Sequence, residues 1–112
     1  MDIEGGEYRV IDDIIKYYNM VNLLIIEFHD TDPLREIFSQ KIQNILEFYY
    51  IVHLHANNNS GVSIDNFPEV VEISFLNRNF LALNELEYRN HLPIKELDFP
   101  NNSLKPDYEL YF

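Results

Sequence analysis

Two histidines on one face of an expected strand are the first residues that could do chemistry. In the segment IVHLHANN, residues 51–58, His53 and His55 share a face, and Asn57 and Asn58 follow at the polar end. An apolar strand has no use for such donors and acceptors at its end unless something is held there. Taken singly, His53 fits a core histidine satisfied by a backbone carbonyl equally well, and the two asparagines fit a turn.

A second set of polar residues ends the apolar run VNLLIIEF, residues 21–28. The run is short and bounded by turn signals, which predicts a strand buried on both faces, with Glu27 inside it. A buried carboxylate needs partners, so Glu27 is more than an ordinary surface charge. His29 and Asp30 follow directly. An imidazole beside a carboxylate suits proton transfer near neutral pH, or a metal bound through oxygen and nitrogen.

Helices should bring these strand ends together. Apolar residues at three- and four-residue spacing predict a first helix from Glu7 to Tyr18 or Asn19. A second helix is expected to start at Thr31–Pro33, with a cap residue followed by proline in the first turn. The order strand, helix, strand predicts a right-handed crossover, which places both strand ends at one edge of the sheet.

Three groups of side chains should therefore meet at this edge. They are Asp2 with Glu4 before the first helix, Glu27 with His29, and His53 with His55 and Asn57. A polar loop follows, and then VVEISFLNR, residues 70–78, alternates as a half-covered strand. Because only a loop connects this strand to the previous one, we expect the two to be antiparallel.

Composition and charge exclude several classes of protein. The chain has 112 residues, 46% of them hydrophobic, which fits one globular domain. Its formal net charge of −11 argues against binding nucleic acid or an anionic membrane surface. It has no cysteine, and therefore no disulfide framework and no thiolate zinc site. No run is long enough to span a bilayer and the N-terminal segment is acidic, so a cytoplasmic location is expected.

Five blocks of the sequence resemble the C-terminal half of FkbM-type methyltransferases. They are DIEGGEY at 2–8, IIEFHD at 25–30, VHLHANN at 52–58, PEVVEISFLNR at 68–78 and LPIKELDFPNN at 92–102. That family contains S-adenosylmethionine-dependent O-methyltransferases, which commonly act on hydroxyls of sugars or natural products. DIEGGE is the most specific block. In the family it follows a strand, so Met1 resembles an internal methionine.

The resemblance implies an α/β fold, a truncated Rossmann-like class I methyltransferase with a mixed sheet. Residues 1–112 would form its C-terminal part, with two helices and the last three strands at 21–28, 50–55 and 70–76. The N-terminal cofactor-binding half would be absent, and no G-x-G signature occurs in the chain. S-adenosylmethionine is therefore expected in the parent enzyme, and no cofactor is expected on the isolated chain.

The same resemblance implies that the retained residues form the acceptor side of the site. The catalytic candidates are Asp2, Glu4, Glu27, His53 and His55. The substrate-binding candidates are His29, Asn57 and Asn58. Asp2 would also touch the cofactor, no metal is expected, and the exact base is not assigned.

Three functions stay open from the sequence. The first is the acceptor-binding part of an O-methyltransferase, with a small-molecule or glycan hydroxyl as substrate. The second is a non-catalytic remnant or accessory module that pairs with a separate chain. The third and weakest is a small metal-binding protein using Glu27, His29, His53 and His55. In the first two, the strand at 21–28 lacks a neighbour, so we expect an open edge, open apolar area and a homodimer formed through this edge.

Overall fold

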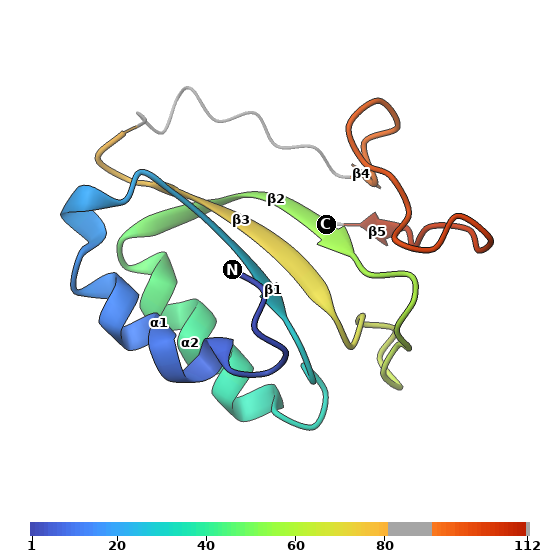
Figure 1. The fold of residues 1–112 in the computed structure, drawn as a ribbon, viewed down its shortest axis with the longest axis horizontal. Helices are drawn as coiled ribbons and strands as arrows, with labels where there is room; N and C mark the ends of the chain where they lie inside the picture. Colours follow the sequence, from blue (N-terminus) through green and yellow to red (C-terminus); the bar gives the residue numbers. More distant parts are fainter. Residues whose placement is uncertain (81–90, 112) are drawn as a thin grey trace.

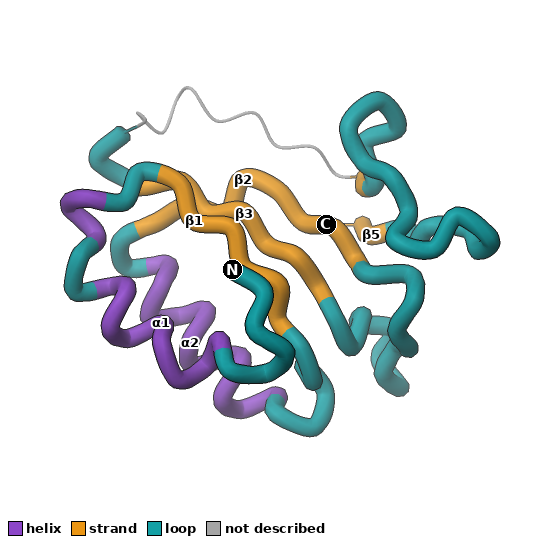
Figure 2. The backbone as a smooth tube through the Cα atoms, viewed as in Figure 1, coloured by secondary structure: helices purple, strands orange, loops and turns teal. Residues whose placement is uncertain are grey.

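The chain folds into a small α/β domain with two helices and a three-stranded sheet. The computed structural model describes residues 1–80 and 91–111. Figure 1 labels the helices and strands, and Figure 2 traces the backbone between them. The elements are α1 (Glu7–Ile15), a 3-10 turn (Tyr18–Met20), β1 (Leu23–Phe28), α2 (Arg35–Leu46), β2 (Tyr49–Ala56), β3 (Val71–Asn77), β4 (His91–Leu92) and β5 (Leu110–Tyr111).

The strand order in the main sheet is β1-β3-β2, and each neighbouring pair is antiparallel. The antiparallel pairing of β2 and β3 confirms the expectation from their short connection. The expected direct parallel pairing of β1 with β2, and with it the mixed sheet, is wrong for the described residues. β1 and β2 run in the same direction, but β3 lies between them and pairs with both (Figure 1). A central position suits β3, because Val71, Ile73 and Phe75 are buried and every second residue faces the core.

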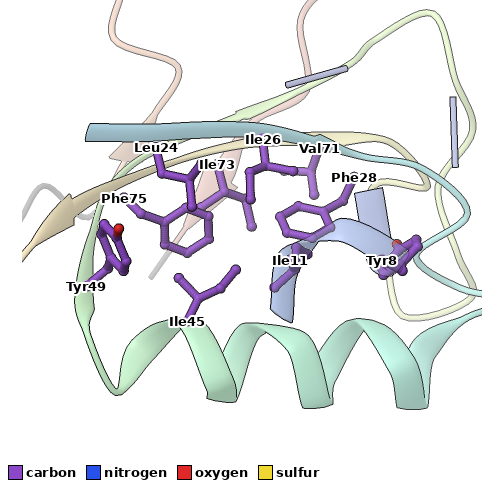
Figure 3. Close-up of a cluster of buried hydrophobic side chains, with 10 residues drawn as sticks. All are labelled: Tyr8, Ile11, Leu24, Ile26, Phe28, Ile45, Tyr49, Val71, Ile73 and Phe75. Carbon is purple, nitrogen blue, oxygen red and sulfur yellow. The ribbon is translucent and has the colours of Figure 1, made fainter. Parts of the chain in front are cut away.

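The core lies between the sheet and the two helices, which cover the same face (Figures 1 and 3). β1 contributes Leu24, Ile26 and Phe28, and α2 contributes Ile45 from the opposite side. The other face of β1 is open: Leu23 is 54% exposed and Ile25 is 41% exposed. The apolar run therefore does not mark a strand buried on both faces, as its continuity predicted. Buried positions alternate with exposed ones along β1, and the exposed apolar residues agree with the expected open apolar area.

β1 is the outer strand of the described sheet. Its free edge is partly used by Met1, whose amino group donates to the carbonyl of Ile25, while the N–H of Glu27 donates to the Met1 carbonyl over 2.9 Å. Two such bonds on either side of one residue are the pattern of a parallel ladder. Met1 thus lies beside β1 as one residue of a parallel neighbour would.

Residues 91–111, here called the strap, form a separate unit at the far side of β2 (Figure 1). β4 and β5 pair with each other and not with the main sheet. No described strap residue belongs to the hydrophobic core cluster between the sheet and the helices. In the part of the chain that the structure describes, no helix has the length and apolar character needed to cross a membrane.

Candidate functional site

A tight turn carries the acidic N-terminal residues to the end of β1. Gly5 has φ +90°, a conformation that side chains disfavour, and Glu4 before it has φ 53°. The N–H of Gly6 donates to the carbonyl of Ile3 over 3.1 Å and closes the turn just before α1 begins. The two glycines of the sequence block thus allow Glu4 to fold back toward the strand end.

His29 follows β1 and is held from one side by Glu7. The Nδ1 atom lies 3.0 Å from Glu7 Oε1, which also accepts the backbone N–H of His29 over 2.7 Å. Glu7 Oε2 accepts the N–H of Gly5 over 3.0 Å. The Glu7 side chain is fully buried, so these bonds satisfy a charge that burial would otherwise make costly. They fix the imidazole ring with Nε2 pointing away from Glu7.

Three further carboxylates surround the free end of this ring. Nε2 lies 3.5 Å from Glu4 Oε2, 3.6 Å from Glu27 Oε1 and 3.8 Å from Asp2 Oδ1. We call this set the His29 cluster; its five members are Asp2, Glu4, Glu7, Glu27 and His29. The distances exceed those of ordinary hydrogen bonds, so the carboxylates form a ring of negative charge around Nε2 without closing on it.

The cluster changes the basicity of His29. Burial lowers the pKa of His29, but the hydrogen bond to Glu7 and the charges of Glu7, Glu27 and Glu4 outweigh it, and the pKa is raised above its usual value. The neighbouring Tyr8 donates its hydroxyl to the carbonyl of His29. Burial and the charge of Glu7 raise the pKa of Tyr8, so its hydroxyl stays a donor.

Asn57 connects the end of β2 to this cluster. Its Nδ2 donates to Glu27 Oε1 over 3.1 Å, and its Oδ1 accepts the N–H of Asn59 over 3.0 Å. Two of the three predicted groups, with Asn57 from the third, therefore lie together at one edge of the sheet. The Glu27 carboxylate accepts a hydrogen bond from the Asn57 amide and lies 3.6 Å from the His29 imidazole. This partly buried acid therefore has polar partners, which it needs.

The two histidines of β2 lie elsewhere on the same sheet face. His55 and Glu27 are both opposite Glu72 on β3, so β3 separates them. His53 Nε2 lies 2.8 Å from Asp98 Oδ1, and His55 Nε2 lies 2.9 Å from Asp107 Oδ2. Within the described residues, no hydrogen bond or ion pair joins either imidazole to the His29 cluster. Both are instead paired with aspartates of the strap.

Asn58, expected to bind substrate, is fully buried and holds the strap. Its Nδ2 donates to the carbonyls of Asn102, Lys105 and Pro106 over 3.0–3.2 Å, and its Oδ1 accepts the N–H of Asn102 over 2.7 Å. A single amide thus uses both its donor and its acceptor on one short piece of chain. This side chain has a clear structural role in the described fold.

Glu7, Asp98 and Asp107 are the site residues that the sequence did not indicate. The sequence pattern predicts for Glu7 only that the first helix begins there. Its position four residues before the buried Ile11 was an available signal, because it puts a carboxylate on the apolar face of α1. No local pattern marks the two strap aspartates, whose partners lie about half a chain away.

No family model, curated protein or solved structure matches this chain. The resemblance to FkbM-type methyltransferases therefore depends on the five sequence blocks.

Proposed function

We propose that this chain forms the acceptor side of an S-adenosylmethionine-dependent O-methyltransferase that acts on a hydroxyl of a sugar or natural product. The observation that carries the proposal is the contact of His29 Nδ1 with the buried Glu7 carboxylate, which as an acceptor favours a proton on Nδ1. With Nδ1–H directed to Glu7 Oε1 at 3.0 Å, the neutral imidazole presents the Nε2 lone pair to the open end of the site. A general base for a hydroxyl needs this arrangement.

The surrounding groups support the same role. An acceptor hydroxyl bound at the end of β1 would give its proton to Nε2 of His29 as its oxygen gains the methyl group. The carboxylates of Glu4 and Glu27, 3.5 and 3.6 Å from Nε2, would stabilise the imidazolium that forms. Carboxylate oxygens are also good acceptors for the remaining hydroxyls of a sugar. We assign His29 the role of base and Asp2, Glu4 and Glu27 the roles of orienting and charge-stabilising groups.

S-adenosylmethionine would supply the electrophilic methyl group when bound. The described residues contain no glycine-rich G-x-G turn of the kind that cradles the methionine end of this cofactor in the resembling family. They therefore do not fit the cofactor as a self-contained site. We expect the isolated chain to show no useful affinity for S-adenosylmethionine, and micromolar binding in a calorimetric titration would contradict this expectation.

Two measurements test the enzymatic proposal. The DNA upstream of Met1 should continue in frame through a glycine-rich motif. The protein encoded by that longer frame should then release S-adenosylhomocysteine when it is given a panel of sugars and polyols. Replacing His29 with Asn should reduce this rate by about 10²–10⁴-fold, the usual contribution of a general base. The matched control is His91→Asn, because that half-exposed imidazole lies outside the His29 cluster.

The non-catalytic alternative gives a different result. A stop codon upstream, with an independent neighbouring gene, would favour an accessory module that pairs with a separate chain. In that case co-purification with the neighbour's product would be observed, and His29→Asn would leave the pairing unchanged.

A second candidate function is binding of a divalent cation by Asp2, Glu4, Glu27 and His29. One specific observation favours it: Nε2 lies 3.5–3.8 Å from one oxygen of each of the three carboxylates. An oxygen of Asp2, an oxygen of Glu4 and a nitrogen of His29 all lie within 4.8 Å of one another. Ligands at about 2.0–2.2 Å from a zinc ion lie roughly 3–3.5 Å from each other, so these side chains would have to move closer together to bind one. Glu7 would then be the carboxylate that orients a ligating histidine. His53 and His55, named for a metal in the sequence-based hypothesis, are paired with the strap and are not in this set.

Calorimetric titration with Zn²⁺ and Mn²⁺ tests this candidate. We expect Glu7→Gln to weaken the affinity about 10–100-fold, the usual effect of losing such an orienting carboxylate. Asp13→Asn removes an exposed carboxylate elsewhere on α1 and should change nothing. Absence of heat from either ion at millimolar concentration would eliminate the metal function and leave the general-base proposal standing.

A further inference from the structure

The strap contacts β2 on the face of the sheet that the helices leave uncovered. His53 and His55 both point to this face, and the strap pairs with both through Asp98 and Asp107. The imidazole side chains are only 24% and 13% exposed as a result. The strap therefore hides the two groups that the sequence marked as the most reactive on β2.

Described hydrogen bonds and ion pairs tie the strap to β2 and to the loop that follows β2. Besides the two imidazole–carboxylate pairs, they are the four bonds of Asn58, one bond between Asn102 and Asn59, and the Tyr108 hydroxyl donating to the Ser60 carbonyl. Such bonds replace bonds to water, so each adds little net stability. Burial of apolar surface contributes less to the strap than to the main body: Leu92 is buried, at 5% exposure, but no described strap residue joins the core cluster between the sheet and the helices.

Three large apolar side chains of the strap are exposed to solvent. Leu97 is 70% exposed, Phe99 is 76% exposed and Leu104 is 93% exposed. A segment with few buried apolar contacts and many polar ones belongs to the low-stability end of local unfolding. Its closed position depends on a small number of identifiable side chains, of which Asn58 makes the most bonds.

We propose that the strap is a lid that opens as one unit while the sheet and helices stay folded, and that its opening uncovers His53 and His55. Asn58 is the main latch, and the pairs with Asp98 and Asp107 are two further ones. This role rests on the proposed function: the lid would control access of an acceptor to the sheet face next to the His29 cluster. The opening itself is independent of that function and can be measured without substrate or cofactor.

Hydrogen exchange followed by mass spectrometry tests the opening. In the unmodified chain, amides of 94–108 should exchange at least about 10-fold faster than those of β1 and β3. Asn58→Ala should speed strap exchange by a further factor of about 10, with β1 and β3 unchanged. Asp13→Asn, which removes the exposed ion pair with Lys16 on α1, should alter neither rate. Strap and sheet amides that exchange together in every variant would overturn the proposal, because the strap would then open only on global unfolding.

Labelling with diethyl pyrocarbonate tests what the opening uncovers. His53 and His55 should be modified faster in Asn58→Ala than in the unmodified chain, while His29 in the main body provides an internal reference. Asp98→Asn and Asp107→Asn are milder variants that keep the experiment decisive if Asn58→Ala does not fold. Each should speed labelling of its own partner more than that of the other histidine. Equal labelling rates in all folded variants would show that the strap is no lid.

Discussion

At the scale of single residues, the buried carboxylate of Glu7 determines how His29 can act. It fixes the ring by accepting from Nδ1 over 3.0 Å, and it is the closest of the charges that raise the pKa of His29. Glu7→Gln keeps the shape and removes the charge, so we expect the pKa of His29 to fall. NMR spectra of the imidazole protons, recorded during a pH titration, measure the pKa of His29. An unchanged pKa would mean that the charges of Glu4 and Glu27 alone support the imidazolium.

The same raised pKa makes the stability of the fold depend on pH. A histidine in an unfolded chain has a pKa of about 6.5, and the pKa of His29 in the folded chain is higher. Protonation of His29 therefore stabilises the fold fully below the unfolded value, and this stabilisation is lost as the pH rises through the folded value. From about pH 6 to about pH 9, the free energy of unfolding in urea should fall more for the unmodified chain than for His29→Gln. Parallel pH profiles of the two proteins would contradict this linkage.

Residue types predicted part of this site. Asp2, Glu4, Glu27 and His29 were expected at one place because the crossover puts the strand ends at one edge, and the structure brings them together there. His53 and His55 were expected to join them, but that depended on the neighbour of each strand. The inserted β3 and the strap decide where those two imidazoles lie, and both are long-range features that a local pattern does not carry.

At the scale of elements, β3 holds the sheet together, because it is paired on both sides. Phe75 on this strand is fully buried and packs edge-on against Phe28 of β1, with ring centroids 6.5 Å apart. We expect Phe75→Ala to lower the free energy of unfolding by about 3–5 kcal/mol. Leu23→Ala on β1, where the side chain is 54% exposed, should cost less than about 1 kcal/mol. Chemical denaturation with circular dichroism compares the two.

If Phe75→Ala does not fold, Phe75→Leu keeps most of the volume and should remain measurable. A loss for Phe75→Leu no larger than that for Leu23→Ala would show that β3 is not central to the stability of the sheet.

Helix and strand positions were predicted well and their order in space was not. Local patterns placed the starts of α1 and α2 and all three long strands within a few residues of their observed bounds, while α1 ends at Ile15 and not at the expected Tyr18 or Asn19. Strand order was missed, because inserting β3 between β1 and β2 changes no residue's local pattern. The strap was missed for a related reason: its prolines and asparagines indicate turns, while its position depends on the amide of Asn58.

At the scale of the whole molecule, the free edge of β1 is the feature with the clearest consequence. β1 is the outer strand of the described sheet, with Leu23 and Ile25 exposed beside it. No lysine or proline lies within Leu23–Phe28 to discourage pairing. Met1 uses only the Ile25 carbonyl and the Glu27 N–H of this edge. The proposal that the chain pairs with a second copy through β1 depends on this surface.

We expect the purified chain to form dimers or larger species despite its net charge of −11. Exposed charges are screened over about 8 Å at physiological salt, whereas strand pairing acts at contact. Ile25→Lys puts a charge on the open face of β1 and should shift the protein toward monomer in size-exclusion chromatography with light scattering. Ile64→Lys makes the same change at a fully exposed loop position and should leave the mass unchanged. A stable monomer of the unmodified chain at high concentration would mean that the edge is protected, and that the described sheet is sufficient on its own.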